Sequence, residues 1–247
     1  MRKNILITGA SSGLGAEMAR QFAARGHDLA LCARRTERLE EVRAEILTRD
    51  PGRRVEARAL DVTDHEQVFE VFGELAGALG SLDRVVVNAG SGKGAPLGAG
   101  KHWANRETAL TNFVGALAQT EAAMEVFRAQ NAGHLVMVSS VSAVRGMPRS
   151  MATYAATKAG VAHLAEGLRV ELAGSPIKVT VVYPGYIASE MNAGVRTRFM
   201  VDTEEGVRAI VEAIEKEKAS AVVPRLPWAP MSLALRYAPL PVYRRLL

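Results

Sequence analysis

The feature that most constrains the fold of this chain is its alternation of short β-branched segments with longer segments of helical spacing. This alternation is typical of βαβ units, in which parallel strands form one sheet and helices cover both of its faces. The segments expected to be strands are residues 4–8, 28–33, 55–60, 84–88, 134–139, 177–183 and 220–223. The segments expected to be helices include residues 15–25, 36–48, 66–78, 107–128 and 154–173. The sequence therefore predicts an α/β fold with a doubly wound parallel sheet of about seven strands.

The length of 247 residues suits one large α/β core, so a single domain over residues 1–247 is expected. No run of about 18 apolar residues that could span a bilayer is present. The net charge is +5, but the basic residues form no run and no patch interleaved with aromatic residues, so no nucleic-acid partner is expected. Cys32 is the only cysteine and can form no internal disulfide, which favours a reducing, cytoplasmic location.

The last 24 residues differ in character from the alternating segments before them. They hold five of the ten prolines, together with Trp228 and the arginines Arg236, Arg244 and Arg245. This composition does not predict another βα unit. Three interpretations of residues 224–247 remain open: an arm packed on the body of the protein, a lid over a substrate, or an amphipathic segment in weak contact with a membrane.

A glycine-rich turn follows the first expected strand and leads directly into a helical segment. Gly9 permits a tight turn, Gly13 allows the backbone to approach a pyrophosphate, and Gly15 allows helix and strand to pack closely. The free amides at the start of the helix favour a bound anion. The residues expected to hold a cofactor here are Gly9, Ser11, Ser12, Gly13, Leu14 and Gly15. The position of this turn in a βαβ unit indicates a Rossmann-like site for a dinucleotide.

The residues after the second expected strand indicate which dinucleotide is bound. A carboxylate at this place would hold the ribose 2′-hydroxyl of NAD. The chain has Arg34 and Arg35 instead, and paired arginines can clamp a 2′-phosphate through charge-assisted hydrogen bonds. NADP(H) is therefore the expected cofactor.

Five motifs occur in order along the chain: TGASSGLG, Asp61-Val62, Asn88-Ala89-Gly90, Tyr154-Ala-Ala-Thr-Lys158 and Pro184-Gly185. Through them the chain resembles the short-chain dehydrogenase/reductase family, in its shorter, NADP-preferring branch. The resemblance runs from Ile5 to about Met191. It implies a cofactor-binding and catalytic core over residues 1–185, a substrate-binding loop over 186–202 and a C-terminal arm over 224–247.

The resemblance also implies further contacts of the cofactor. The residues expected at the adenine are Asp61 and Val62, and those expected behind the cofactor are Asn88, Ala89 and Gly90. The residues expected at the nicotinamide are Pro184, Gly185, Ile187 and Ser189. Ser189 stands where the family usually has threonine, and this replacement keeps the hydroxyl group. Pairing of the helices over residues 107–128 and 154–173 between subunits would give a homodimer or homotetramer.

Tyr154 is the expected acid/base. Reduction of a carbonyl requires a hydride on carbon and a proton on oxygen, and a tyrosine with a pKa near ~10 exchanges protons poorly at neutral pH. Lys158 lies four residues later on the same expected helix, so both side chains project from one face. Its positive charge is expected to lower the pKa of Tyr154, and both residues are also expected to contact the cofactor.

A hydroxyl group that donates to the carbonyl oxygen of the substrate is expected at the end of the fifth strand. The resemblance selects Ser140, and Ser139 and Ser142 remain alternatives because Ser140 is one residue farther from the tyrosine than is usual. The resemblance also gives Asn112 the role of holding a water molecule that relays protons through the lysine. No metal is expected, since the five histidines have no ligand spacing and there is one cysteine.

The predicted function is interconversion of a ketone or aldehyde and an alcohol, dependent on NADP(H), with Tyr154 as acid/base. Substrate specificity is expected to depend on residues 145–153 as well as on the loop 186–202. Five apolar side chains there indicate a sizeable apolar small molecule or, equally, lid or core packing: Met147, Met151, Met191, Phe199 and Met200. Two alternatives are a 3-oxoacyl-thioester ketoreductase and a non-catalytic dinucleotide-binding sensor. The proline-rich tail argues against the first, and the complete set Asn112, Ser140, Tyr154 and Lys158 argues against the second.

Overall fold

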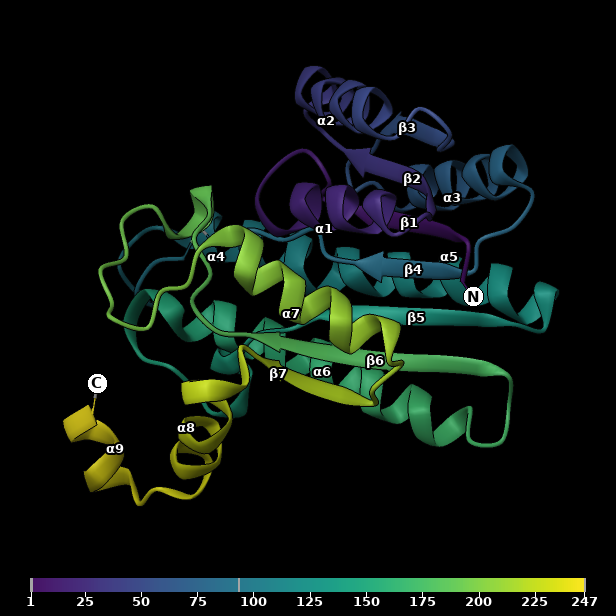
Figure 1. The fold of residues 1–247 in the computed structure, drawn as a ribbon. Helices are drawn as coiled ribbons and strands as arrows, with labels where there is room; N and C mark the ends of the chain where they lie inside the picture. The colour runs from purple at the N-terminus through teal and green to yellow at the C-terminus, as the bar shows by residue number, and fades with distance from the viewer. Residues whose placement is uncertain (1, 93, 247) are drawn as a thin grey trace.

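A parallel sheet of seven strands forms the centre of the computed structural model, which describes residues 2–92 and 94–246 (Figure 1). The strands are β1 (Asn4–Thr8), β2 (Asp28–Ala33), β3 (Val55–Ala59), β4 (Arg84–Val87), β5 (Gly133–Val138), β6 (Ile177–Pro184) and β7 (Ser220–Val223). They lie in the order β3-β2-β1-β4-β5-β6-β7, and every neighbouring pair is parallel. The predicted Rossmann-like sheet is confirmed, with each strand end within one residue of its expected place.

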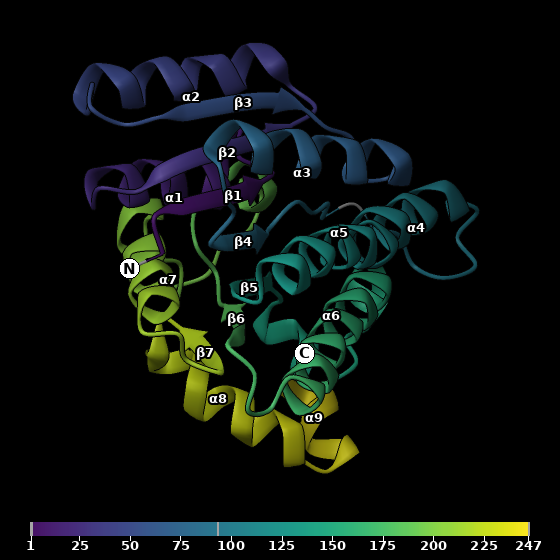
Figure 2. The same cartoon turned by 90° about the vertical axis from the view of Figure 1, so that its right-hand side faces the viewer.

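Helices cover both faces of the sheet, as Figure 2 shows from the side. One layer consists of α1 (Gly13–Ala24), α2 (Thr36–Arg49) and α7 (Thr203–Glu215). The other consists of α3 (His65–Leu79), α5 (Gly115–Gln130) and α6 (Ala152–Glu171), and α4 (His102–Ala109) leads into α5. Two short helices, α8 (Arg225–Tyr237) and α9 (Leu240–Leu246), follow β7. None of the helices in the described residues is both long and apolar enough to cross a bilayer.

The central strands are apolar on both faces because a helical layer covers each face. Along β1, Leu6 packs in the cluster that includes α3, α5 and α6, whereas Ile5 and Ile7 pack in the cluster that includes α1, α2 and α7. All five residues of β1 are buried. The strand order reverses between β1 and β4, and in open α/β sheets the crevice at this place, beyond the carboxyl ends of the strands, is where ligands bind.

The helix expected over residues 107–128 starts earlier than expected and is not uniform. Its first part, α4, begins at His102, and its last part, α5, ends at Gln130. Between them, Leu110–Val114 form a π-helical turn that contains Asn112. Apolar spacing does not reveal such a turn, because one wider turn disturbs the helical period only locally.

The C-terminal arm is helical and packs at the carboxyl end of the sheet (Figure 1). The Arg145 guanidinium donates to the carbonyl oxygen of Leu235 at 2.8 Å and also to that of Ala238. The Tyr243 hydroxyl donates to the carbonyl oxygen of Gly146 at 2.8 Å. These bonds attach both tail helices to the segment that follows β5.

Candidate active site

The glycine-rich turn after β1 brings backbone from three segments into close contact. Gly9 and Gly13 have φ of +65° and +53°, a left-handed conformation that favours glycine. A Cβ atom on Gly15 would lie 2.2 Å from the Gly9 carbonyl oxygen, and one on Gly9 would lie 2.9 Å from Cα of Ala89. Any side chain at Gly9 or Gly15 would therefore clash with backbone.

The start of α1 can hold an anion. The first amides of a helix have no acceptor within the helix, and the first turn of α1 contains no acidic residue. The turn is held against β4 because Thr8 Oγ1 accepts from the backbone amides of Asn88 and Ala89, each at 3.1 Å. The Asn88 amide group in turn donates to the Thr8 carbonyl oxygen at 2.9 Å. A glycine-lined cradle with free amides fits a dinucleotide pyrophosphate.

A single cavity of about 530 Å³ extends from this cradle across the carboxyl ends of the strands. Every residue that the sequence predicts for the cofactor lines it, from Gly9 through Arg34, Asp61 and Asn88 to Ser189. The cavity therefore collects groups from segments that are far apart in the chain. Its length along the strand ends and its glycine-lined floor fit an extended dinucleotide.

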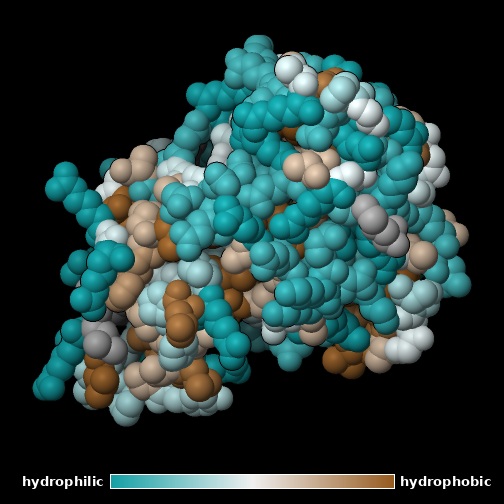
Figure 3. All heavy atoms as spheres, viewed as in Figure 1, coloured by the Kyte–Doolittle hydropathy of each residue, from teal (hydrophilic) through white to brown (hydrophobic). Residues whose placement is uncertain are grey.

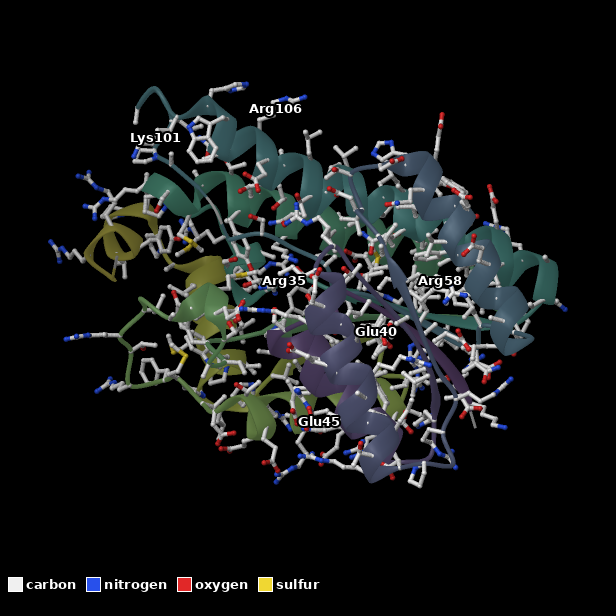
Figure 4. The ribbon with its side chains drawn as sticks, turned by 90° about the horizontal axis from the view of Figure 1, so that it is seen from above. Arg35, Glu40, Glu45, Arg58, Lys101 and Arg106 are labelled. Atoms are coloured by element: carbon white, nitrogen blue, oxygen red, sulfur yellow. The ribbon has the colours of Figure 1, made fainter. Side chains whose placement is uncertain are left out.

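The two arginines after β2 are held by carboxylates. Arg34 lies 3.9 Å from a carboxylate oxygen of Asp61. Arg35, labelled in Figure 4 at the start of α2, donates to Ser12 Oγ at 2.5 Å and to Glu190 Oε2 at 3.0 Å. Arg38 donates to the other oxygen of Glu190 at 2.5 Å. Glu190 thus links the loop after β6 to α2 across the cavity.

Glu190 lies in the expected substrate-binding loop, but its contact with the arginines was not predicted. Hydrogen bonds from Arg35 and then from Arg38 hold the pKa of its carboxyl group below its usual value. No local pattern signals this contact, because Arg35 and Glu190 are 155 residues apart in the chain. Because Glu190 already accepts from Arg35, a phosphate that binds there would compete with this carboxylate for the Arg35 guanidinium group.

The three serines that follow β5 have different partners. Ser139 is buried, and its hydroxyl donates to the Lys158 carbonyl oxygen at 2.8 Å. Ser140 hydrogen-bonds to Tyr154, and its Oγ accepts from the backbone amide and the hydroxyl of Ser142, at 3.2 and 3.0 Å. Of the three, Ser140 is therefore the one whose hydroxyl is directed at the tyrosine, as the resemblance had selected.

Tyr154 stands in the first turn of α6 and is partly exposed to the cavity. Desolvation by the cavity walls raises the pKa of Tyr154, and hydrogen bonding with Ser140 opposes this effect. The expected lowering of its pKa by Lys158 is not seen in this arrangement. The ammonium group lies 6.0 Å from the centre of the tyrosine ring and donates instead to the Val138 carbonyl oxygen at 2.8 Å.

Lys158 is almost fully buried, and desolvation lowers the pKa of its ammonium group to about 8. Asn112 lies close by, behind the cavity wall. Its amide group accepts from the Ser91 amide at 2.6 Å and donates to the Ser91 carbonyl oxygen at 2.8 Å. A Cβ atom on Gly90 would lie 3.3 Å from Asn112 Oδ1 and 3.6 Å from Lys158 Nζ. Asn112 thus fixes the backbone that borders the lysine.

The other half of the cavity is apolar. Of the hydrophobic residues that the sequence singled out, Met147, Met151 and Met191 line it, and Phe199 instead packs on Trp228 with ring centres 5.8 Å apart. Tyr186, from the expected substrate-binding loop, also lines the cavity, and so do three residues of the tail that were not predicted individually: Trp228, Ser232 and Leu235. Trp228 is buried, and its Nε1 has no hydrogen-bond partner among the described residues.

A metal site is not formed by the part of the chain that the structure describes. Across residues 2–92 and 94–246, no three histidine, cysteine, aspartate or glutamate side chains are grouped to hold an ion. Cys32 is buried in β2, and desolvation raises the pKa of its thiol to about 12.

Comparisons with known proteins agree with this geometry. The family model described as short chain dehydrogenase matches residues 3–199. An uncharacterized oxidoreductase of Mycobacterium tuberculosis is 57% identical over 231 residues, which cover 93% of this chain and 91% of the relative. A short-chain dehydrogenase from Sphingobium yanoikuyae in complex with NADPH is 30% identical, with a TM-score of 0.83 and coverage of 94% and 92%. One from Burkholderia phymatum in complex with NAD has a TM-score of 0.84 at 22% identity, with coverage of 97% and 94%, and shares the fold.

Proposed function

This chain is a member of the short-chain dehydrogenase family, and on that premise we propose that it is an NADP(H)-dependent oxidoreductase that interconverts a ketone or aldehyde and an alcohol. The observation that carries the proposal is the shared cavity. Ser140, Tyr154 and Lys158 line the same cavity as the glycine cradle and the arginine pair. A proton donor and a dinucleotide cradle that open into one space are what carbonyl reduction requires.

The bound nicotinamide supplies the hydride, and the chain supplies the proton and the orientation of the carbonyl group. Ser140 Oγ accepts two hydrogen bonds from Ser142, so both of its lone pairs are used. Its one hydroxyl hydrogen is therefore left to donate, to Tyr154 in this structure and to a carbonyl oxygen when a substrate is placed beside it. Ser142 thus orients the Ser140 hydroxyl.

Tyr154 acts as the proton donor in this proposal. Because desolvation raises the pKa of Tyr154, the phenol keeps its proton at neutral pH and can give it to the carbonyl oxygen. Lys158, with a pKa of about 8, changes its protonation near neutrality and can return a proton to the site. Asn112 holds the backbone beside the ammonium group, and a relay through water at this place remains part of the proposal.

The preference for NADP(H) rests on charge. Arg34 and Arg35 line the cavity just beyond β2, and Arg35 contacts Ser12 in the glycine-rich turn. Two guanidinium groups at this place attract a 2′-phosphate. The NADPH complex of the relative at 30% identity supports this part of the proposal. The substrate half of the cavity has apolar walls, so we propose an uncharged, largely apolar carbonyl compound.

We also propose a cytoplasmic homodimer or homotetramer. The contact would involve the face formed by α4, α5 and α6, where Trp103, Phe113 and Leu117 are exposed. Several exposed aromatic and aliphatic side chains on one face are typical of interfaces between subunits. Light scattering of the purified protein measures this assembly directly.

The test of the function is Tyr154→Phe, assayed on a panel of ketones, aldehydes and a 3-oxoacyl thioester with NADPH and NADH. Turnover is expected to fall by about 10²–10⁴ with every accepted substrate, because the proton donor is lost. Binding of NADPH, measured by fluorescence titration, is expected to persist. Tyr183→Phe is the matched control, since Tyr183 lies in β6 and packs against the core. An unchanged rate in Tyr154→Phe would disprove the proposed role, and no turnover by the wild type on any substrate would favour a sensor.

A further inference from the structure

The outer side of the two tail helices exposes large apolar side chains to solvent. Leu226, Leu233, Tyr237 and Leu240 are each more than 60% exposed, and Val242 is 48% exposed. We call these five residues the outer tail face. Figure 3 shows hydrophobic residues beside hydrophilic ones at lower left, where Figure 1 draws α8 and α9. A set of this size within 17 consecutive positions is unlike the single exposed apolar residues that are normal on protein surfaces.

The charged side chains of the tail itself have one sign. No aspartate or glutamate follows Glu217 in the chain. The arginines Arg225, Arg236, Arg244 and Arg245 are all exposed. Arg236 lies over the ring of Tyr237, with 5.9 Å between the guanidinium carbon and the ring centre. The exposed part of the tail therefore carries both apolar and cationic side chains.

The inner side of the tail holds this face in place. Arg145 lies 4.3 Å from the ring centre of Tyr243 and donates to the end of α8 at Leu235. Trp228 is buried against Gly185, where a Cβ atom would lie 2.2 Å from the indole nitrogen. Because polar and aromatic contacts fix the inner side, the apolar residues of the outer tail face cannot turn inward without breaking them.

We propose that the outer tail face docks on the surface of an anionic lipid bilayer. Leucine, valine and tyrosine side chains would enter the interface between headgroups and acyl chains, and the arginines would contact lipid phosphates. The charge selects this partner over a second copy of the chain. A two-fold contact through the same face would place its arginines beside the arginines of the other copy. A nucleic acid would neutralise the arginines but leave the apolar side chains in water.

Docking would bring the substrate half of the cavity close to the bilayer. Trp228, Ser232 and Leu235 of α8 line the cavity, while Leu233 and Tyr237 of the same helix belong to the outer tail face. One helix thus separates the apolar half of the cavity from the docking surface. Access of a lipophilic carbonyl substrate from the bilayer rests on the proposed function, whereas docking itself does not.

The test is flotation of the full-length protein with vesicles of phosphatidylglycerol and phosphatidylcholine, compared with vesicles of phosphatidylcholine alone. The protein is expected to float with the anionic vesicles, and less so at high salt. The pair Arg244→Gln and Arg245→Gln is expected to lower the partition coefficient about tenfold or more. The pair Leu233→Ser and Tyr237→Ser is expected to lower it to a similar degree. Flotation involves no turnover, so its outcome is independent of the proposed reaction.

Two controls match these variants. Lys101→Gln with Arg106→Gln removes two cations on or beside α4, both labelled in Figure 4, and Val170→Ser removes an apolar side chain of α6 that is 75% exposed. Both controls are expected to bind as the wild type does, and circular dichroism and thermal unfolding check that all variants are folded. Equal binding to both kinds of vesicle, or equal loss in tail variants and controls, would overturn the proposal. Loss of an oligomer in the Leu233→Ser and Tyr237→Ser pair, without vesicle binding by the wild type, would assign the face to a second copy.

Discussion

At the amino end of the sheet, Arg84 and His134 are buried against each other, whereas at the carboxyl end Lys158 and Tyr154 border an open cavity. Arg84 Nε donates to His134 Nδ1 at 2.9 Å, and its Nη1 lies 2.5 Å from a carboxylate oxygen of Glu215. Lys158, buried to a similar degree, makes one hydrogen bond to a backbone carbonyl. Burial of polar groups is common to both ends. The difference is whether those groups face each other or a space that a ligand can enter.

This difference decides which end can exchange protons near neutral pH. Desolvation and the nearby Arg84 charge lower the pKa of His134 to about 2, so its ring stays neutral over the whole physiological range. The pKa of Lys158 is lowered to about 8, so its charge can change near neutral pH. The His134 ring is therefore fixed in one protonation state, and Lys158 at the carboxyl end is able to change its state.

The largest expected effect comes from Lys158→Met, which should lower activity and raise stability. Turnover is expected to fall by about 10²–10⁴, because the group that exchanges protons beside Tyr154 is lost. The free energy of unfolding at pH 7 is expected to rise by up to about 3 kcal/mol, because the buried charge is removed. Activity assays and urea unfolding measure the two quantities.

The pH dependence of this stability gain has a defined sign. The pKa of Lys158 is about 8 in the folded chain and near 10.5 in the unfolded chain, so the unfolded chain binds the proton more tightly. Below pH 8, burial of the charged lysine lowers the free energy of unfolding of the wild type by its full amount. This loss becomes smaller as pH rises toward 10.5. The difference in free energy of unfolding between Lys158→Met and the wild type should therefore decrease between pH 7 and pH 10. Lys178→Met, at an exposed position of β6, is the control, and its free energy of unfolding should equal that of the wild type at both pH values.

Arg84→Met tests the opposite end and should lower stability without affecting the chemistry. The substitution leaves Glu215 and His134 without their donor, and removal of one partner from a largely buried pair costs about 3 kcal/mol. Turnover per folded molecule at 25 °C is expected to stay at the wild-type value, because the network lies at the other end of the sheet from the cavity. A fall in turnover with unchanged stability would contradict the division of roles between the two ends.

His134→Gln tests the protonation state of the amino end. Because the pKa of His134 is about 2 when folded and near 6.5 when unfolded, the wild type loses stability as pH falls through and below 6.5. Glutamine can accept from Arg84 and donate to Thr180, which the histidine ring contacts at 2.8 Å. Between pH 6.5 and pH 4.5, the free energy of unfolding of the variant is expected to fall by about 2 kcal/mol less than that of the wild type. Urea unfolding at both pH values, with the exposed His102→Gln as control, measures the difference.

The sequence predicted the strands of this fold closely and the contacts across the cavity only in part. Strand limits were within one residue because β1 and its neighbours are buried on both faces and form continuous apolar runs. Local spacing was enough to identify the glycine turn and the pair Tyr154 and Lys158. It could not predict that the Lys158 ammonium group points toward Val138, because this direction depends on packing between α6 and β5.

Residues whose contacts the sequence analysis did not predict share one physical property: each reaches the cavity from a distant segment. Glu190 meets Arg35 across 155 positions, and Trp228 enters from a tail whose composition did not predict a helix. The π-helical turn that carries Asn112 is also invisible in the pattern, because apolar spacing on either side of it continues as in an α-helix. Tertiary packing places Glu190 and Trp228.

The smallest expected effect concerns the exposed ion pairs of the carboxyl end, which, unlike the Arg84 network, are open to exchange with a ligand. Arg34→Asp is expected to shift the preference between NADPH and NADH about tenfold toward NADH, because a carboxylate repels the 2′-phosphate. Glu190→Gln is expected to shift it a few-fold the other way, because Arg35 and Arg38 lose the carboxylate that they share. Dissociation constants for both cofactors, measured by fluorescence titration, check the two shifts. Glu204→Gln, which alters an exposed ion pair with Arg208 on α7, is the control. A strong NADH preference in the wild type, or equal shifts in all three variants, would contradict the role of this arginine pair.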